Sequence, residues 1–168
     1  IQVESTQGVG TKFTVDISFD TASEADVYRN QISEQPDILE KLEGKRILLA
    51  EDNDLNAEIA IELLAEQKII TDRAEDGAEC LDKLEKAVAG YYDMILMDIQ
   101  MPVMDGYDAA ARIRRMKDEK KASIPIVAMT ANAFAEDRQK AISMGMNDHV
   151  AKPIDMNVLL PVIAKYIR

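Results

Sequence analysis

Four short, mostly apolar runs, each followed by a polar residue, constrain the fold of this chain most strongly. The runs are residues 47–50, 94–97, 126–129 and 149–151, and they end in Glu51 and Asp52, Asp98, Thr130 and Lys152 respectively. Runs without polar alternation are typical of strands buried on both faces, as in a parallel sheet. Because ligands bind outside the carboxyl ends of such strands, these polar side chains are expected to share one functional edge.

Helical patterns separate the runs in a regular alternation. The expected strands are 46–50, 69–73, 94–98, 126–130 and 149–151, and the expected helices are about 54–67, 77–89, 106–118, 134–144 and 156–167. Five strands that alternate with five helices predict an α/β fold with a doubly wound parallel sheet. The flavodoxin-like strand order 2-1-3-4-5 has its switch point between the first and third strands, where Glu51, Asp52 and Asp98 lie.

The first 43 residues follow a different pattern. Alternating apolar residues up to Phe19 predict a β-hairpin appendage over residues 1–20. Residues 21–43 are polar and acidic, which is typical of a linker, and residues 44–168 form the predicted main domain. Within the linker, Pro36 can open a short helix that ends before Gly44, the alternative being a segment without fixed structure. We interpret the chain, which starts at Ile1, as a piece of a longer protein.

The composition limits the partners of the chain. A net charge of −11 without a basic segment argues against nucleic-acid binding and against contact with an anionic membrane. The lone Cys80 excludes an internal disulfide and a cysteine zinc site, which fits a reducing compartment. The sequence contains no apolar run long enough to span a bilayer. We therefore expect a cytoplasmic fragment, whose parent protein can still be membrane-anchored.

The polar side chains at the predicted edge suit phosphoryl chemistry. Neighbouring carboxylates repel one another unless a cation lies among them, and a site with few carboxylate ligands suits Mg²⁺. The absence of His and Cys from this set argues against zinc or copper. Lys152 is a point charge suited to phosphate, and Thr130 adds a hydroxyl donor. Together they predict transient phosphorylation of Asp98 through in-line attack by its carboxylate.

Each of these residues also has a simpler interpretation. Glu51 and Asp52 can cap the helix that follows the first strand, with Asp54 or Asn56 sharing that role. Lys152 can be a solvated surface lysine, and Thr130 can be a capping hydroxyl. The convergence of these five residues at the ends of four strands favours one shared site over separate, unrelated roles.

Residues 46–168 resemble a response-regulator receiver domain. The resemblance rests on the segments ILLAEDN at 47–53, MDIQMPVMDG at 97–106, MTANA at 129–133 and AKP at 151–153. It implies that Asp98 is the phosphoacceptor and that Asp52 and Asp98 bind Mg²⁺ directly. The backbone carbonyl of Gln100 would complete the protein ligands, and Glu51 would act largely through water.

The resemblance also assigns residues to signalling after phosphorylation. Lys152 would pair with the phosphoryl group, and Thr130 would be the switch hydroxyl. The bond between Lys152 and Pro153 is often cis in this family. His149 stands where the family usually has Tyr or Phe, so its flat ring is a candidate second switch residue, the alternative being a packed or solvated histidine.

The N-terminal residues resemble a second family. The pattern I-x-V-E-S-x-x-G-x-G-T-x-F over residues 1–13 is similar to the closing strands of histidine-kinase ATP-binding domains, although any amphipathic hairpin is an alternative. The two resemblances together imply a fragment of a hybrid histidine kinase. Asp98 would then receive phosphate from the kinase core of the parent chain and pass it to a histidine phosphotransfer protein. The fragment lacks the kinase core, so whether it is an enzyme stays open.

Other functions are compatible with this fold class. A flavodoxin-type electron carrier would need a hydroxyl- and glycine-rich phosphate loop, whereas the acids at 51–54 would repel FMN phosphate. An aspartate phosphohydrolase would place its nucleophile after the first strand, whereas Asp98 follows the third. A docking module without phosphorylation is a further alternative. So is a phospho-switch docking module that regulates its own kinase.

Overall fold

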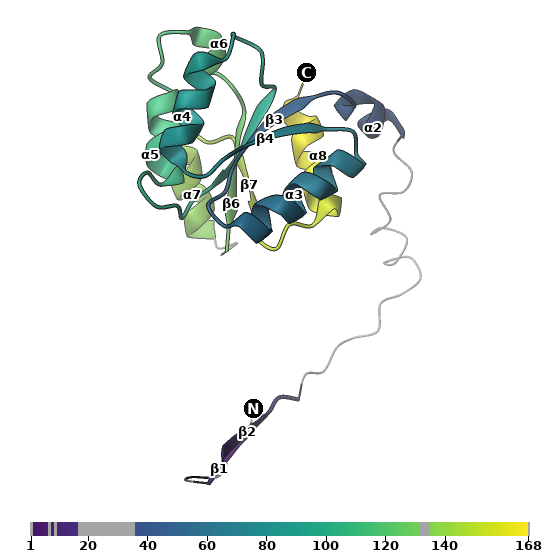
Figure 1. Cartoon of the computed structure of the whole chain (residues 1–168), viewed down its shortest axis with the longest axis vertical. Coiled ribbons are helices and arrows are strands. Elements are labelled where there is room, and N and C mark those ends of the chain that lie inside the picture. Colours follow the sequence, from purple (N-terminus) through teal and green to yellow (C-terminus); the bar gives the residue numbers. More distant parts are fainter. Residues whose placement is uncertain (1, 7, 9, 17–35, 132–134, 168) are drawn as a thin grey trace. The chain divides into compact units, whose positions relative to one another are not determined.

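The predicted parallel sheet forms in the computed structural model, which describes residues 2–6, 8, 10–16, 36–131 and 135–167. Its five strands are β3 (Arg46–Ala50), β4 (Ile70–Ala74), β5 (Met94–Asp98), β6 (Ile126–Thr130) and β7 (Asp148–Ala151). Their order is β4-β3-β5-β6-β7, with every neighbouring pair parallel. This is the predicted order, and it places β3 directly beside β5. Figure 1 shows the sheet between its helices.

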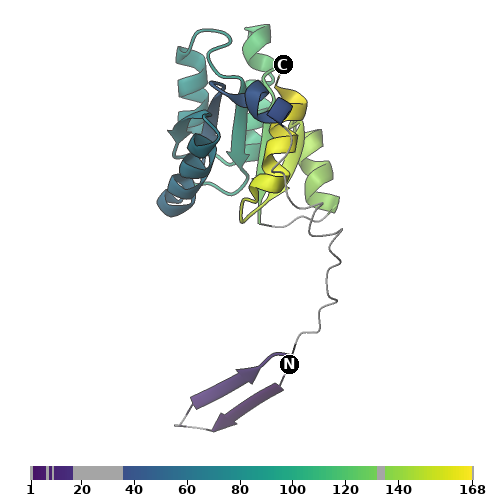
Figure 2. The same cartoon turned by 90° about the vertical axis from the view of Figure 1, so that its right-hand side faces the viewer.

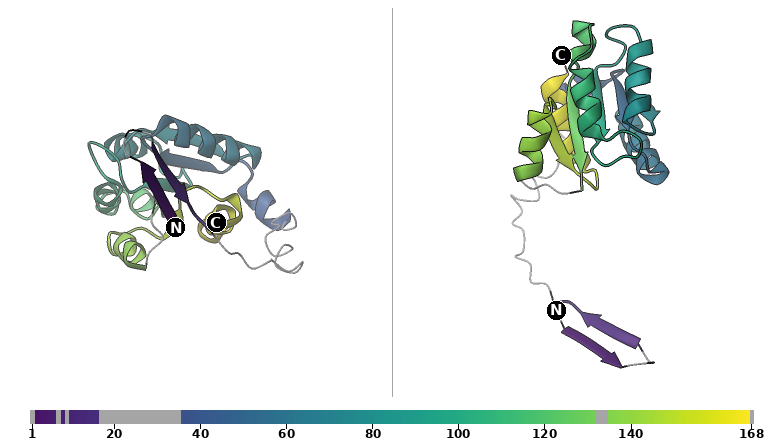
Figure 3. Two further views of the ribbon diagram at one scale, coloured as in Figure 1. Left: turned by 90° about the horizontal axis from the view of Figure 1, so that it is seen from below. Right: turned by 90° about the vertical axis from the view of Figure 1, so that its left-hand side faces the viewer.

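Helices cover both faces of the sheet because its central strands, β3, β5 and β6, are apolar on both sides. Ile47 and Leu49 of β3 pack toward one face, and Leu48 and Ala50 pack toward the other. The first face is covered by α3 (Asp54–Glu66) and α8 (Met156–Tyr166). The second is covered by α4 (Gly77–Lys86), α5 (Gly106–Ile113) and α7 (Ala135–Ser143), which face the viewer in the right panel of Figure 3.

Two predicted helices are shorter than expected. The helix expected over 77–89 ends at Lys86. The segment predicted as a helix over 106–118 ends at Ile113, and a separate short helix, α6 (Glu119–Ala122), follows. The guanidinium of Arg114 donates hydrogen bonds to the carbonyls of Ala122, Ile124 and Gly145 at 2.7–2.8 Å. These contacts hold the segment after α6 and the turn at Gly145 against the end of α5.

The segment before the first sheet strand also contains a helix. The short helix expected at Pro36 forms as α2 (Pro36–Leu42). It contacts α8, where Lys41 Nζ donates to the carbonyl of Ala164 at 2.6 Å. Leu42 is fully buried, so the end of α2 packs into the core beneath α3 and α8.

The described N-terminal residues, up to Asp16, belong to a unit of their own. In it, β1 (Gln2–Thr6) and β2 (Gly10–Thr14) pair antiparallel as the predicted hairpin (Figure 2). Its apolar side chains are exposed, with 68% of Phe13 accessible. The expected continuation of the apolar face at Ile17 and Phe19 lies outside the described residues. Within the described ranges, every helix is too short or too polar to cross a bilayer.

Candidate functional site

Three carboxylates meet at the edge of the sheet where β3 and β5 end. Glu51 and Asp52 directly follow β3, and Asp98 is the last residue of β5. Each of the three offers one oxygen that lies within 4.8 Å of the others. Glu51 and Asp98 are buried, whereas Asp52 is exposed to solvent. The structure therefore brings together the three acids that the sequence places at the switch point.

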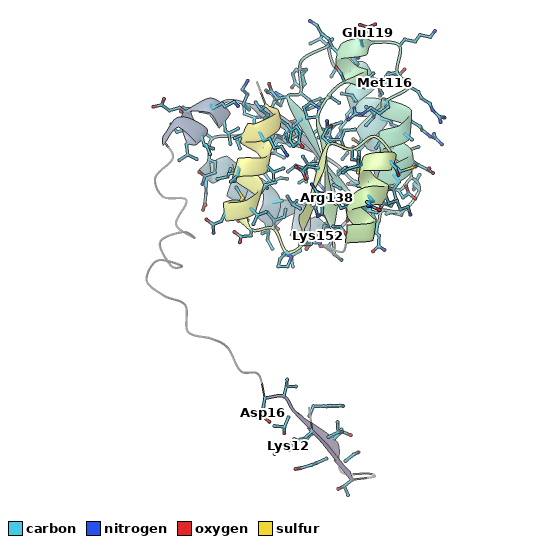
Figure 4. The ribbon with its side chains drawn as sticks, turned by 180° about the vertical axis from the view of Figure 1, so that it is seen from behind. Lys12, Asp16, Met116, Glu119, Arg138 and Lys152 are labelled. Carbon is cyan, nitrogen blue, oxygen red and sulfur yellow. The ribbon has the colours of Figure 1, made fainter. Side chains whose placement is uncertain are left out.

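Lys152 joins the acids from β7, two strands away from β5. Its Nζ lies 2.5 Å from Glu51 Oε2 and 2.5 Å from Asp98 Oδ2. Only 20% of the Lys152 side chain is exposed, so it is not a solvated surface lysine. Its peptide bond to Pro153 is cis. Figure 4 shows Lys152 at the end of the domain opposite to Glu119 of α6.

The pairing changes how these groups titrate. Burial raises the pKa of the Asp98 carboxyl above its ordinary value, and the hydrogen bond from Lys152 offsets only part of that rise. Burial acts to lower the pKa of Lys152, but its hydrogen bonds with Asp98 and Glu51 outweigh burial and raise that pKa. Lys152 is therefore a lasting positive charge beside a carboxylate of increased basicity.

Another residue caps the helix that follows the acids. Asn53 is the N-cap of α3, and its Oδ1 accepts a hydrogen bond from the backbone N of Asn56 at 3.0 Å. The side-chain Nδ2 of Asn56 donates to Glu51 Oε1 at 3.0 Å. The interpretation of Glu51 and Asp52 as the helix cap is therefore wrong.

A cavity of about 260 Å³ opens beside Asp98. Its lining includes Gln100, Thr130 and Lys152. Thr130, the predicted switch residue, and Gln100, the predicted backbone ligand of Mg²⁺, therefore line the same space as Asp98. The backbone N of Gln100 also donates to Asp98 Oδ1 at 3.1 Å. One water in the liquid takes up about 30 Å³, so the volume of this cavity corresponds to several waters. A phosphoryl group therefore fits into it.

Sequence reasoning missed two residues of this cavity. Tyr107 and Lys140 line it, and Lys140 Nζ lies 4.3 Å from the centre of the Tyr107 ring. This cation–π contact brings a second ammonium group to the cavity beside Asp98. Tyr107 follows the MDG segment directly and could have been found from the motif. Lys140 could not, because it reaches the cavity only through the packing of α7.

The structure does not place His149 at this cavity. His149 lies in β7, opposite Ala128 of β6, and it is not among the residues that line the Asp98 cavity. Its Nδ1 is buried without a hydrogen-bond partner, 3.7 Å from Asp148 Oδ1. A role in switching would therefore act through Thr130, which ends the neighbouring strand, and not through contact with Asp98.

The sequence of this chain matches a known family over the whole sheet. Residues 47–164 fit the family described as the response regulator receiver domain. The chain belongs to the response-regulator receiver family. Its relatives among curated proteins include several named as hybrid signal transduction histidine kinases.

Two of these relatives are much longer than this receiver domain. Hybrid signal transduction histidine kinase B of Dictyostelium discoideum is 41% identical over 138 residues, which are 76% of this chain and 7% of that protein. Sensor protein EvgS of Escherichia coli is 32% identical over 159 residues, 95% of this chain and 12% of that protein. The receiver domain therefore corresponds to a small part of each relative.

Solved receiver domains share the fold. The receiver domain of sensor histidine kinase PA1611 from Pseudomonas aeruginosa, with a magnesium ion coordinated in its active site cleft, is 35% identical with a TM-score of 0.66. It covers 73% of this chain and 97% of its own. The receiver domain of Ssk1, in a complex with the histidine phosphotransfer protein Ypd1 of Saccharomyces cerevisiae, is 30% identical with a TM-score of 0.67. The match covers 74% of this chain and 90% of the Ssk1 chain.

Proposed function

We propose that this receiver domain accepts a phosphoryl group on Asp98 from a phosphohistidine and passes it on to a histidine phosphotransfer protein. The observation that carries the proposal is the pairing of Lys152 with both Asp98 and Glu51 at 2.5 Å, beside a cavity with room for the phosphoryl group. In the parent protein, the phosphoryl donor would be the histidine kinase core. The hybrid kinases among the relatives support this assignment.

The chemistry follows from the positions of the side chains. A carboxylate oxygen of Asp98 attacks phosphorus, the new P–O bond forms as the P–N bond breaks, and the electron pair leaves with the imidazole, which takes up a proton from water. Lys152 moves from its carboxylate partners to the phosphoryl oxygens and balances their charge. Its hydrogen bonds with Asp98 and Glu51 raise the pKa of Lys152, so it is protonated when the transfer begins.

The acids would hold Mg²⁺. Three carboxylates and one ammonium group leave a net negative charge at this edge, and hard oxygen ligands of this kind fit the ion. Asp52, Asp98 and the carbonyl of Gln100 would bind it directly, with Glu51 acting through water. When bound, Mg²⁺ would neutralise charge on the phosphoryl oxygens.

Two single variants separate the proposed metal roles. Asp52→Ala should raise the Kd for Mg²⁺ by about tenfold or more, because a direct ligand is lost. Glu51→Gln should have a smaller effect, because the Glu51 oxygens are already engaged by Lys152 and Asn56. Isothermal titration calorimetry measures both values. A larger loss in Glu51→Gln than in Asp52→Ala would reverse the two roles.

The edge beside the acids offers a docking surface for the phosphotransfer partner. Leu55 and Ile59 of α3 are exposed at 64% and 46%. Ile59 lines a cavity of about 310 Å³ together with Glu51, Lys152 and Ile154. An apolar groove next to the reactive carboxylate suits a partner that must bring its histidine to Asp98. Mixing the phosphorylated domain with a purified histidine phosphotransfer domain should move the label to the partner, whereas retention of the label on the receiver would contradict the relay.

Thr130 would report phosphorylation to the rest of the domain. It is buried, ends β6 and lines the Asp98 cavity, so it can approach a new phosphoryl oxygen. Its movement would vacate space that the ring of His149 can enter, which would couple the site to α7, β7 and α8.

The coupling is tested with Thr130→Ala and His149→Ala. Thr130→Ala should still accept phosphate at Asp98 but lose the response of residues 135–167, and His149→Ala should weaken that response less. NMR chemical shifts after addition of BeF₃⁻ and Mg²⁺ measure the response in each variant. If residues 135–167 stay unmoved in the unsubstituted protein while the acidic edge responds, the domain relays phosphate without a distal switch.

For the whole chain, we propose a domain order in which residues 1–20 are the last strands of a kinase ATP-binding domain, 21–43 a linker and 44–168 the receiver. The match to EvgS supports this order, because an alignment over 95% of the chain includes most of its first 43 residues. The exposed apolar side chains of the hairpin also suit strands that complete a larger sheet.

A further inference from the structure

The loop that carries Glu51 and Asp52 depends on a side chain from the neighbouring strand. β3 ends at Ala50, so the carbonyls of the next two residues lie beyond the last ladder pair of β3 and β4. Arg73 of β4 supplies donors to both: its Nε lies 3.1 Å from the carbonyl of Glu51, and its Nη2 lies 3.2 Å from that of Asp52. Its Nη1 lies 2.8 Å from Asp54 Oδ1.

The position of Arg73 in the sheet explains this reach. It pairs with Leu49 in the parallel ladder, one residue before β3 ends. A guanidinium presents several donors in a rigid planar fork, so one side chain can engage two carbonyls and a carboxylate together. Only 23% of the Arg73 side chain is exposed, and Lys83 donates to the backbone carbonyl of Arg73. The arginine is therefore itself held in place.

We propose that Arg73 is a positioning residue for the metal site, which fixes the loop from Glu51 to Asp54 so that its acids meet Asp98. The inference rests on the proposed function, in which Asp52 is a direct ligand of Mg²⁺. Groups that hold a ligand in place commonly contribute about 10- to 100-fold to metal affinity. Arg73 touches the backbone of both acidic residues, so losing it releases both at once.

The sign of the effect distinguishes positioning from simple charge. Arg73 is a cation near a site for a cation, so charge alone would make its removal strengthen Mg²⁺ binding. Positioning predicts the opposite, because a loop that is no longer held loses conformational order that Mg²⁺ must restore on binding. Weaker binding after removal of a positive charge is therefore diagnostic.

The experiment is a Mg²⁺ titration by calorimetry on the whole chain. Arg73→Met should raise the Kd by about tenfold. Arg46→Met is the matched control, because Arg46 starts β3 at its other end, pairs with Asp72, and is 27% exposed. The control should bind Mg²⁺ within about twofold of the unsubstituted protein, since the same charge is lost away from the loop.

Two further variants separate the contributions of the charge of Arg73 and of its individual contacts. Arg73→Lys keeps the charge but lacks the planar fork of donors, so its Kd should lie between those of the unsubstituted protein and Arg73→Met. If Arg73→Met does not fold, a Kd of Arg73→Lys above that of the unsubstituted protein carries the test. Asp54→Asn removes the ion pair with Arg73 but leaves both carbonyl contacts, so its Kd should change by less than in Arg73→Met. Saturating Mg²⁺ should restore the phosphorylation rate of Arg73→Met by acetyl phosphate.

The outcomes separate this inference from the proposed function. An unchanged or lower Kd in both Arg73 variants would overturn the inference alone, while the unsubstituted protein still binds Mg²⁺. A loss in Asp54→Asn as large as in Arg73→Met would overturn the role of the carbonyl contacts. Absence of Mg²⁺ binding by the unsubstituted protein would overturn the proposed metal site, and the inference with it.

Discussion

Asp98→Asn should abolish phosphorylation of this receiver domain by acetyl phosphate in the presence of Mg²⁺. The amide has nearly the same shape as the carboxylate but lacks the anionic oxygen that attacks phosphorus. Gel separation of phosphorylated from unmodified protein measures the loss. Asp82→Asn is a suitable control, because Asp82 pairs only with Lys86 on the surface of α4 in the described contacts and should keep full labelling. Labelling of Asp98→Asn at the original rate would contradict the assignment.

The fold should tolerate Asp98→Asn. Burial raises the pKa of Asp98 in the folded state, so ionised Asp98 is less favourable there than in the unfolded chain. This cost is present above the folded pKa and disappears as the pH falls below the unfolded pKa. The neutral amide avoids the cost, although Lys152 then keeps only Glu51 as a charged partner.

Gly106→Ala should have the largest effect on stability. A Cβ at this position would overlap the backbone carbonyl oxygen of Asp98 and would lie 2.9 Å from Met97 Cγ. The obstacle is the backbone of the site strand, which cannot turn away as a flexible side chain can. We expect a loss of about 3 kcal/mol in the free energy of unfolding, at the upper end for overpacking.

Urea denaturation measures this loss, and Gly90→Ala provides the comparison. Gly90 has a positive φ of 86° but no atom within 4 Å of its Cβ position, so alanine there meets only backbone strain of roughly 1 kcal/mol. Gly106→Ala should therefore be clearly the less stable of the two. Because the added Cβ of Gly106→Ala displaces the Asp98 carbonyl, phosphorylation of Asp98 should also be slower in this variant. Equal stabilities would show that the site strand can move aside.

The sequence predicts the parts of this domain that depend on local pattern. The apolar runs predict β3, β5 and β6 correctly, because buried parallel strands carry their signal in consecutive residues. The polar residues at the ends of those runs identify the three acids and Thr130, and Lys152 follows the shorter run at β7. The order of the strands then brings them to one edge.

The rest depends on contacts that local pattern does not contain. The end of α5 depends on Arg114, whose partners at Ala122 and Gly145 are distant in the sequence. The positions of Arg73 and Lys140 beside the site likewise depend on the sheet register and on the packing of α7. A surface arginine and a surface lysine look the same in the sequence whether or not they reach the site.

Tandem mass spectrometry of the whole chain, treated with acetyl phosphate and then digested, identifies the residue that carries the phosphoryl group. With Mg²⁺, we expect a single phosphoryl group in the peptide that contains Asp98. With EDTA in place of Mg²⁺, the same peptide should be recovered unmodified. A phosphoryl group on any other peptide, or equal modification of Asp98 with EDTA, would contradict the account.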